Sequence, residues 1–165
     1  MFRKLRRIRQ ALSTSDCAAI LKKGTSGVLA LSGDDGYPYA VPLSYVYDGS
    51  ALYFHGAKAG HKLDAIRRDC RASFCVIDQD QIIPEKYTTY FRSVIVFGRM
   101  RILEEGTEKR AAIEKLAARY SPDEDEAARQ SEIDREYSRL CMMALSIEHM
   151  TGKQAIELVR DQGEK

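Results

Sequence analysis

The sequence predicts a mainly β fold with flanking helices, arranged as a six-stranded antiparallel barrel. Two observations support this class. Short runs rich in β-branched and aromatic residues succeed one another with hairpin turns between them, and the helical patterns gather toward the ends of the chain. In addition, no strand leads into a G-x-G-x-x-G turn and strands do not alternate regularly with helices, so a doubly wound parallel sheet is not expected.

The length and composition indicate one ordinary domain over residues 1–165, with a basic arm at residues 1–12 and a tail at residues 154–165. The hydrophobic fraction of 44% and the charged fraction of 30% are typical of soluble globular proteins, and no apolar run approaches the roughly 18 residues of a membrane span. No long apolar region follows the basic start, so we expect no secretory signal, no membrane partner and a cytoplasmic location.

The net charge of +2 is too small to predict a nucleic-acid partner for the domain. The exception is the start of the chain, where Arg3, Lys4, Arg6, Arg7 and Arg9 crowd together. Short charge runs usually face water, so we expect a solvated arm; a contact with phosphate or nucleic acid is the alternative.

The first helix is expected over about Thr14–Lys23, because Ser13 and Asp16 give an S-x-x-D opening and Gly24 follows the apolar positions. The apolar run after it, from Gly27 to Gly33, has the length of a strand.

The turn Asp34-Asp35-Gly36 then predicts a hairpin whose returning strand is Tyr37–Tyr47. Pro38 and Pro42 cannot donate ladder hydrogen bonds, so this strand should lie at a sheet edge, at a bulge or where a ligand approaches. The tyrosines that alternate along it either line a half-wet sheet face or serve a flat aromatic ligand.

The stretch Ser50–Ile66 begins as a strand and ends as a helix, with the run H-G-A-K-A-G-H-K-L from His55 to Leu63 in between. Flexible backbone N–H groups that enter a helix beside cations suit a bound anion, and especially a phosphate. Lys62 follows His61 at the predicted helix start, so this turn is either a phosphate site or an ordinary polar turn.

The second half supplies the remaining elements. In order, we expect a strand Arg71–Asp78, a polar loop Gln79–Lys86, a long strand Tyr87–Leu103 with a bend at Gly98, a helix Glu105–Tyr120, an exposed charged helix after Pro122, a strand Cys141–Met150 and a short helix in the tail.

Neither a metal site nor a nucleophile is predicted. His55, His61 and His149 lack zinc-like spacing, the four cysteines include no C-x-x-C pair, and no G-x-S-x-G elbow is present. His55 ends a strand, and taken alone it is a candidate acid or base, a metal ligand or a hydrogen-bonded edge residue.

Five motifs carry a resemblance to a known family. They are G-V-L-A, D-G-Y-P-Y-A-V-P-L-S-Y-V-Y, L-Y-F-H-G-A-K-A-G-H-K-L, S-F-C-V and P-E-K-Y-T-T-Y-F-R-S-V-I-V-F-G, in this order. Over roughly residues 1 to 155 the chain resembles the flavin-binding split-barrel superfamily of pyridoxamine 5'-phosphate oxidase, and within it the 5-nitroimidazole-resistance reductase branch.

The resemblance implies a split barrel and a homodimer, with FMN bound in two symmetric clefts that both subunits build. It places the phosphate at the turn with His61 and Lys62, and the histidine beside the flavin ring at His55, the one catalytic candidate. The implied cofactor-binding residues are Val41, Pro42, Leu43, Ser44, His55, Gly56, His61, Lys62, Leu63 and, from the partner subunit, Tyr90 and Ser93.

One departure from the family affects the expected reaction. The segment T-G-K-Q-A-I-E-L, from Thr151, stands where vitamin-forming oxidases carry an arginine and histidine motif for their pyridoxal substrate. Oxidation of pyridoxamine phosphate is therefore not expected.

The leading hypothesis is an FMN-dependent reductase. It would take reducing equivalents from a nicotinamide or another donor and pass them to a small aromatic or quinone-like acceptor, with His55 as a proton donor. A flavin-binding carrier, stress or sensor protein without turnover needs the same cleft, and haem or another planar cofactor is a third possibility.

Overall fold

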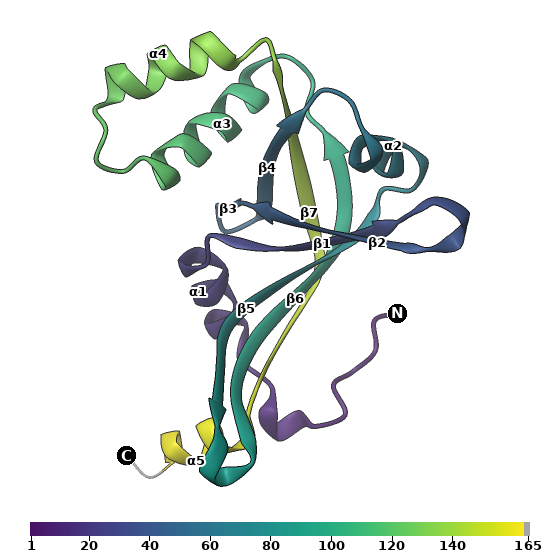
Figure 1. The fold of residues 1–165 in the computed structure, drawn as a ribbon, viewed down its shortest axis with the longest axis vertical. Coiled ribbons are helices and arrows are strands. Elements are labelled where there is room, and N and C mark those ends of the chain that lie inside the picture. The colour runs from purple at the N-terminus through teal and green to yellow at the C-terminus, as the bar shows by residue number, and fades with distance from the viewer. Residues whose placement is uncertain (164–165) are drawn as a thin grey trace.

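A seven-stranded antiparallel sheet, curled into a barrel, forms the centre of the computed structural model, which describes residues 1–163 (Figure 1). The strands are β1 (Ser26–Ser32), β2 (Pro38–Ser44), β3 (Val46–Tyr47), β4 (Ala51–Ala57), β5 (Arg71–Ile83), β6 (Thr88–Ile102) and β7 (Leu140–Gln154). Their order across the sheet is β2-β1-β5-β6-β7-β4-β3.

Helices surround this sheet. The α-helices are α1 (Thr14–Lys23), α2 (His61–Arg68), α3 (Thr107–Tyr120), α4 (Glu126–Glu136) and α5 (Ile156–Gly163), and the short 3-10 helices are η1 (Ile8–Gln10), η2 (Asp34–Gly36) and η3 (Pro84–Lys86). No helix in the described part of the chain is long and apolar enough to cross a membrane.

The barrel closes at Tyr45. The outermost strands of the sheet, β2 and β3, are separated in the chain by this one residue, so the two edges of the sheet must meet there. Tyr45 is fully buried, and its backbone N–H donates to the carbonyl of Thr25 at 3.2 Å instead of to a partner strand. This closure gives the split barrel.

Tyr45 also explains why the predicted continuous strand Tyr37–Tyr47 and the expected total of six strands were wrong. The buried ring turns the chain inward and divides the strand into β2 and β3, which raises the total among residues 1–163 to seven. The expected edge position of the proline-bearing strand is confirmed, because β2 pairs only with β1.

The helix over Thr14–Lys23 is confirmed, with a capping box between Ser13 and Asp16 at its start. The loop predicted over Gln79–Lys86 was wrong, since β5 continues to Ile83. Pairing with β6 satisfies the backbone hydrogen-bonding groups of this segment, and this does not depend on its side chains. The β5–β6 hairpin also projects from the barrel, so its polar side chains reach water (Figure 1).

The bend expected at Gly98 corresponds to a shift in register between β6 and β7. A Cβ atom at Gly98 would lie 2.0 Å from the carbonyl oxygen of Ser146, so only glycine permits this close approach of the two strands.

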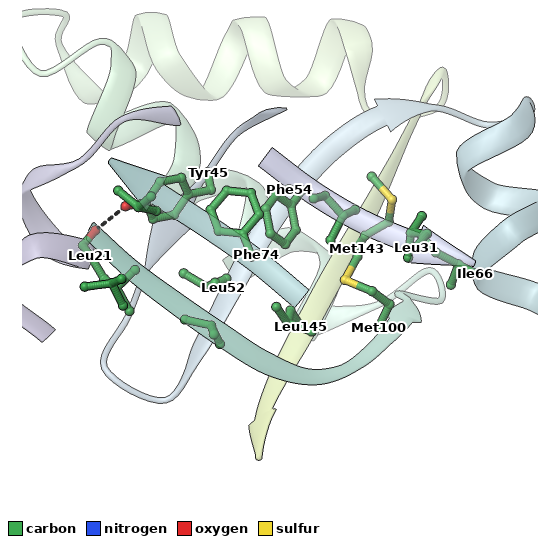
Figure 2. Packing of buried hydrophobic residues seen from close by; sticks show 14 of the residues in the cluster. Leu21, Leu31, Tyr45, Leu52, Phe54, Ile66, Phe74, Met100, Met143 and Leu145 are labelled. Carbon is green, nitrogen blue, oxygen red and sulfur yellow. Dashed lines mark hydrogen bonds between the residues drawn. The ribbon is translucent and has the colours of Figure 1, made fainter. Parts of the chain in front are cut away.

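Two apolar layers stabilise the molecule. The first fills the barrel, where the ring of Phe74 packs edge-on against Tyr45 and Phe54, and the hydroxyl of Tyr45 donates to the carbonyl of Leu21 in α1 (Figure 2). The second lies outside the barrel, between the β4–β7 pair and the α3–α4 helices. Each strand of that pair is therefore buried on both faces.

Candidate functional site

Lys62, in the first turn of α2, reaches back over the end of β4. If residue 56 had a Cβ atom, that atom would lie 3.1 Å from the Nζ of Lys62. Glycine at this position therefore lets the ammonium group lie against the strand. Within residues 1–163 the side chain is half-buried and makes neither a hydrogen bond nor an ion pair. Partial burial lowers the pKa of the Lys62 ammonium, because loss of water disfavours the charged form. An anion placed here would gain a partner for this cation.

The start of α2 adds backbone donors to the same place. Gly60 precedes the helix with a φ of 125°, a conformation that favours glycine, and no side chain caps the helix. The N–H groups at the first turn of a helix have no intrahelical acceptor, and the helix dipole is positive at that end. The N-terminus of α2 and Lys62 therefore form one electropositive corner.

His61 has other partners. Its ring stacks on Tyr39 of β2, with 4.1 Å between the ring centroids, and its Nε2 lies 3.3 Å from a carboxylate oxygen of Asp34. Arg68 donates to the other oxygen of Asp34 at 2.7 Å. These contacts hold the β1–β2 turn onto α2, so His61 positions the helix while Lys62 faces the site.

His55 lies one residue before Gly56 but points to the other side of β4. It is opposite Met142 in the β4–β7 register, on the face that carries Tyr53 and that α3 covers further along the strand. Partial loss of water, and then the charge of Lys62, lower the pKa of His55 below its ordinary value of 6.5. The imidazole is therefore mainly neutral at pH 7.

The four predicted residues of β2 alternate between two environments. Val41 and Leu43 pack against the barrel core, whereas Pro42 and Ser44 are exposed on the outer face. Since β2 has a neighbour on one side only, the peptide groups on its other side remain available to a ligand.

Leu63 fits the prediction least well. Its side chain is buried in the barrel core, and its backbone N–H donates to the carbonyl of Gly60 at 2.9 Å. These contacts anchor α2 to the barrel.

Tyr90 and Ser93 lie on the projecting β5–β6 hairpin, which extends away from α2 (Figure 1). The hydroxyl of Tyr90 is 3.0 Å from the Nζ of Lys86, and Ser93 is opposite Ile77 and Lys153 in the sheet. Within one chain these two residues do not join the corner at Lys62.

A further feature is the open outer face of the sheet. Val28, Cys75 and Ile95 are directly opposite one another on β1, β5 and β6, with Pro42 and Thr151 at the two ends of the row. Val28 is 40% exposed and Ile95 38%, and Ile77 nearby on β5 is 66% exposed. A contiguous apolar strip of this kind on a sheet indicates a contact surface.

The structure thus brings Lys62 against Gly56, joins β2 to α2 through Tyr39 and His61, and leaves Tyr90 and Ser93 apart from them. Sequence reasoning missed Asp34 and Tyr39 as the residues that fix His61, because Asp34 was part of a turn signal and Tyr39 one of several tyrosines. The described residues contain no cluster of three or more His, Cys, Asp or Glu side chains that could hold a metal ion.

Several solved structures share this fold. A candidate 5-nitroimidazole antibiotic resistance protein from Bacteroides thetaiotaomicron has a TM-score of 0.70 at 19% identity, covering 87% of this chain and 86% of its own. An FAD-binding protein from Mesorhizobium loti has a TM-score of 0.62 at 24% identity, covering 88% and 97%. An FAD and haem binding protein from Mycobacterium smegmatis has a TM-score of 0.69 at 21% identity, covering 89% and 73%.

No curated protein matches the sequence. The sequence model of the pyridoxamine 5'-phosphate oxidase family, however, matches residues 13–154, which include every strand of the barrel. With the family model spanning the whole sheet and α2, the chain belongs to the pyridoxamine 5'-phosphate oxidase family.

Proposed function

We propose that the protein binds FMN beside β2, β4 and α2 and acts as a reductase that passes electrons to a small aromatic acceptor, such as a nitroimidazole or a quinone. The observation that carries this proposal is Lys62, a half-buried cation without an anionic partner in the described chain, at an uncapped helix N-terminus. This combination of a cation and free backbone N–H groups fits a phosphate.

In this arrangement Lys62 and the first turn of α2 would hold the FMN phosphate. Gly56 keeps the path of the ammonium clear, and Tyr39, through its stack on His61, keeps the helix start in place. The free edge of β2, from Val41 to Ser44, would direct peptide groups at the polar rim of the ring.

When bound, FMN supplies the electron-transfer chemistry. The chain would contribute orientation, exclusion of water and control of one proton. His55 is the candidate for that proton; its side chain lies on the other face of β4 from Lys62, so this role requires the acceptor to reach past the end of β4. Its lowered pKa means that only a minority of His55 is protonated at neutral pH. A proton donor of this kind works better as the pH falls.

The complete site would need a second copy of the chain. We place the contact at the apolar strip of Val28, Cys75 and Ile95, because Val28 and Ile95 of this strip are exposed to water in one chain. In a two-fold dimer the partner's projecting hairpin would bring Tyr90 and Ser93 to the corner at Lys62, which they do not reach within their own chain.

The relatives support flavin as the ligand class, since one structural neighbour is an FAD-binding protein. Another neighbour binds FAD and haem, which makes haem the second candidate cofactor. The corner at Lys62 fits the phosphate of FMN, because one phosphate can accept from the ammonium and from several N–H groups of the first helical turn at once.

The visible absorption spectrum of the purified protein tests the cofactor. We expect the absorption bands of a flavin, and we expect denaturation to release the flavin as FMN. A Soret band in place of the flavin bands would overturn the assignment.

To test turnover, the protein would be reduced anaerobically and mixed with a nitroimidazole, a quinone or oxygen. Reoxidation no faster than that of free FMN would indicate a carrier or sensor rather than a reductase.

A further inference from the structure

A second cavity lies far from α2, between the N-terminal arm and α5. The arm is attached to the barrel by a bridge between Ala11 and Lys153 and by the N–H of Leu12, which donates to the carbonyl of Gly152 at 3.0 Å. This attachment holds η1 against α5 and leaves between them a cavity of about 440 Å³. Its lining residues are Arg6, Arg7, Ile8, Arg9, Gln10 and Ile156.

The three arginines of this cavity lack partners in the part of the chain that the structure describes. In residues 1–163, Arg6, Arg7 and Arg9 form no ion pair and no side-chain hydrogen bond, and all three are exposed. Several arginines elsewhere are paired with carboxylates, for example Arg68 with Asp34 and Arg71 with Asp69. Three like charges around one cavity repel each other, so an anion bound among them would remove that repulsion and gain charge-assisted hydrogen bonds.

Gln10 adds a different requirement. Its side chain is only 5% exposed, it lines the same cavity, and its Oε1 has no hydrogen-bond donor. A buried carbonyl oxygen without a donor is unfavourable, and a bare inorganic anion has no donor to offer. A ligand that carries a hydroxyl or N–H group besides its negative charge would supply the missing donor; because Oε1 is itself buried, the Gln10 amide would have to turn toward the cavity to accept it.

The remaining wall is apolar. Ile8 is 71% exposed, which is unusual for isoleucine, and Ile156 of α5 also lines the cavity. A flat ring between two such side chains would cover both. The volume is within the range of about 300 to 1,000 Å³ typical of small-molecule sites.

We propose that this cavity binds a nucleoside phosphate, with its phosphates among Arg6, Arg7 and Arg9, a ribose hydroxyl or base N–H donating to Gln10, and its base between Ile8 and Ile156. The site is separate from the phosphate corner at Lys62 and does not depend on the flavin assignment. A reducing nicotinamide dinucleotide and an adenine nucleotide share the required chemistry.

Calorimetric titrations of the purified full-length protein with ADP, NADPH, adenosine and inorganic pyrophosphate test the proposal at about 0.15 M salt. We expect ADP or NADPH to bind at least tenfold more tightly than adenosine or pyrophosphate, because only they use all three parts of the site. Absence of binding by both nucleotides, or pyrophosphate binding as tightly as ADP, would overturn it. So would tighter binding of single-stranded DNA or of anionic phosphatidylglycerol vesicles than of either nucleotide.

Two double variants distinguish specific binding of the nucleotide in the cavity from non-specific electrostatic attraction to the basic arm. Arg7→Gln with Arg9→Gln should weaken ADP binding about tenfold or more, whereas Arg3→Gln with Lys4→Gln removes the same charge outside the cavity and should weaken it less than twofold. Equal weakening by both pairs would contradict the proposal.

Gln10→Leu probes the nucleoside part of the ligand. It should lower ADP affinity several-fold and leave pyrophosphate affinity unchanged, with circular dichroism confirming the fold. An unchanged ratio of ADP to pyrophosphate affinity would remove Gln10 from the site. Flavin content, measured on every variant, reports on the separate site at Lys62.

Discussion

Lys62 is the residue on which the proposed cofactor site depends most. Lys62→Ala should weaken FMN binding by about 1.5 to 3 kcal/mol, roughly 10- to 150-fold, because a charge-assisted contact to the phosphate is lost. Riboflavin, which has no phosphate, should bind as before. Fluorescence titration with the two flavins measures both effects.

The matched control for this change is Lys58→Ala. Lys58 lies in the same turn, but its Nζ is 3.8 Å from Glu105 and its side chain is about half exposed. Lys58→Ala should therefore change the affinity for FMN and for riboflavin by less than twofold. Equal weakening of FMN and riboflavin by Lys62→Ala would mean that the lysine supports the fold of the turn rather than the phosphate.

His55 should give the reaction a pH dependence. Its pKa in the folded protein lies below 6.5, so the protonated fraction, and with it the rate of acceptor reduction, should rise as the pH falls through that region. His55→Gln should abolish this rise and leave FMN affinity nearly intact. Stopped-flow rates between pH 5 and 8 measure the profile; an identical profile in the variant would exclude His55 as the proton donor.

At the scale of single residues, the sequence predicted a phosphate site at this turn but not how the side chains of the turn are arranged. It placed Lys62 at a helix start, yet the approach of its ammonium to Gly56 depends on how α2 folds back over β4. His61 was expected beside Lys62 on the phosphate, and the structure engages it with Asp34 and Tyr39. Such contacts join distant parts of the chain, and no local pattern carries them.

At the scale of elements, the junction between α1 and the barrel depends on Tyr45. Its fully buried hydroxyl donates at 2.8 Å to the carbonyl of Leu21, a group in the last turn of α1 that has no partner within the helix. Tyr45→Phe should lower the free energy of unfolding by about 1 to 2 kcal/mol, because that carbonyl is then buried without a donor. Urea unfolding followed by circular dichroism measures the loss.

Tyr47→Phe is the corresponding control. The hydroxyl of Tyr47 donates to Gly49, two residues along the chain, in an exposed turn where water can replace it. Its removal should cost less than about 0.5 kcal/mol. Similar losses in the two variants would show that the hydroxyl of Tyr45 does not secure α1.

The errors in the predicted elements have one cause. Pattern reading ended β5 at Asp78 because polar residues follow, whereas pairing with β6 continues to Ile83. It also continued one strand through Tyr45, because tyrosine favours strands wherever it lies. In both places the neighbouring strands decided the outcome, and they are remote in sequence.

At the scale of the whole molecule, the proposed dimer explains the apolar strip on the outer sheet face. Ile95→Arg places a charge in the middle of the row formed with Val28 and Cys75, and it should convert a dimer to a monomer. Flavin content should fall with it, because each site would need Tyr90 and Ser93 of the partner. Light scattering and the flavin-to-protein absorbance ratio measure the two results.

Ser131→Arg, on the exposed side of α4, adds the same charge away from the strip and should change neither result. A monomeric Ile95→Arg variant that retains flavin would mean that one chain builds the site alone. A variant that remains dimeric would place the interface elsewhere.

The sequence by itself determined the family, the succession of hairpins and the edge position of the proline-bearing strand, since each depends on residues close together in the chain. Only the tertiary structure decided that the sheet closes at Tyr45, that Lys62 lies against Gly56 without a partner in the described chain, and that Asp34 holds His61. It also revealed the cavity between the arm and α5. The physical reason is that closure, burial and charge pairing join segments far apart in sequence, whereas propensity and turn chemistry act between neighbours.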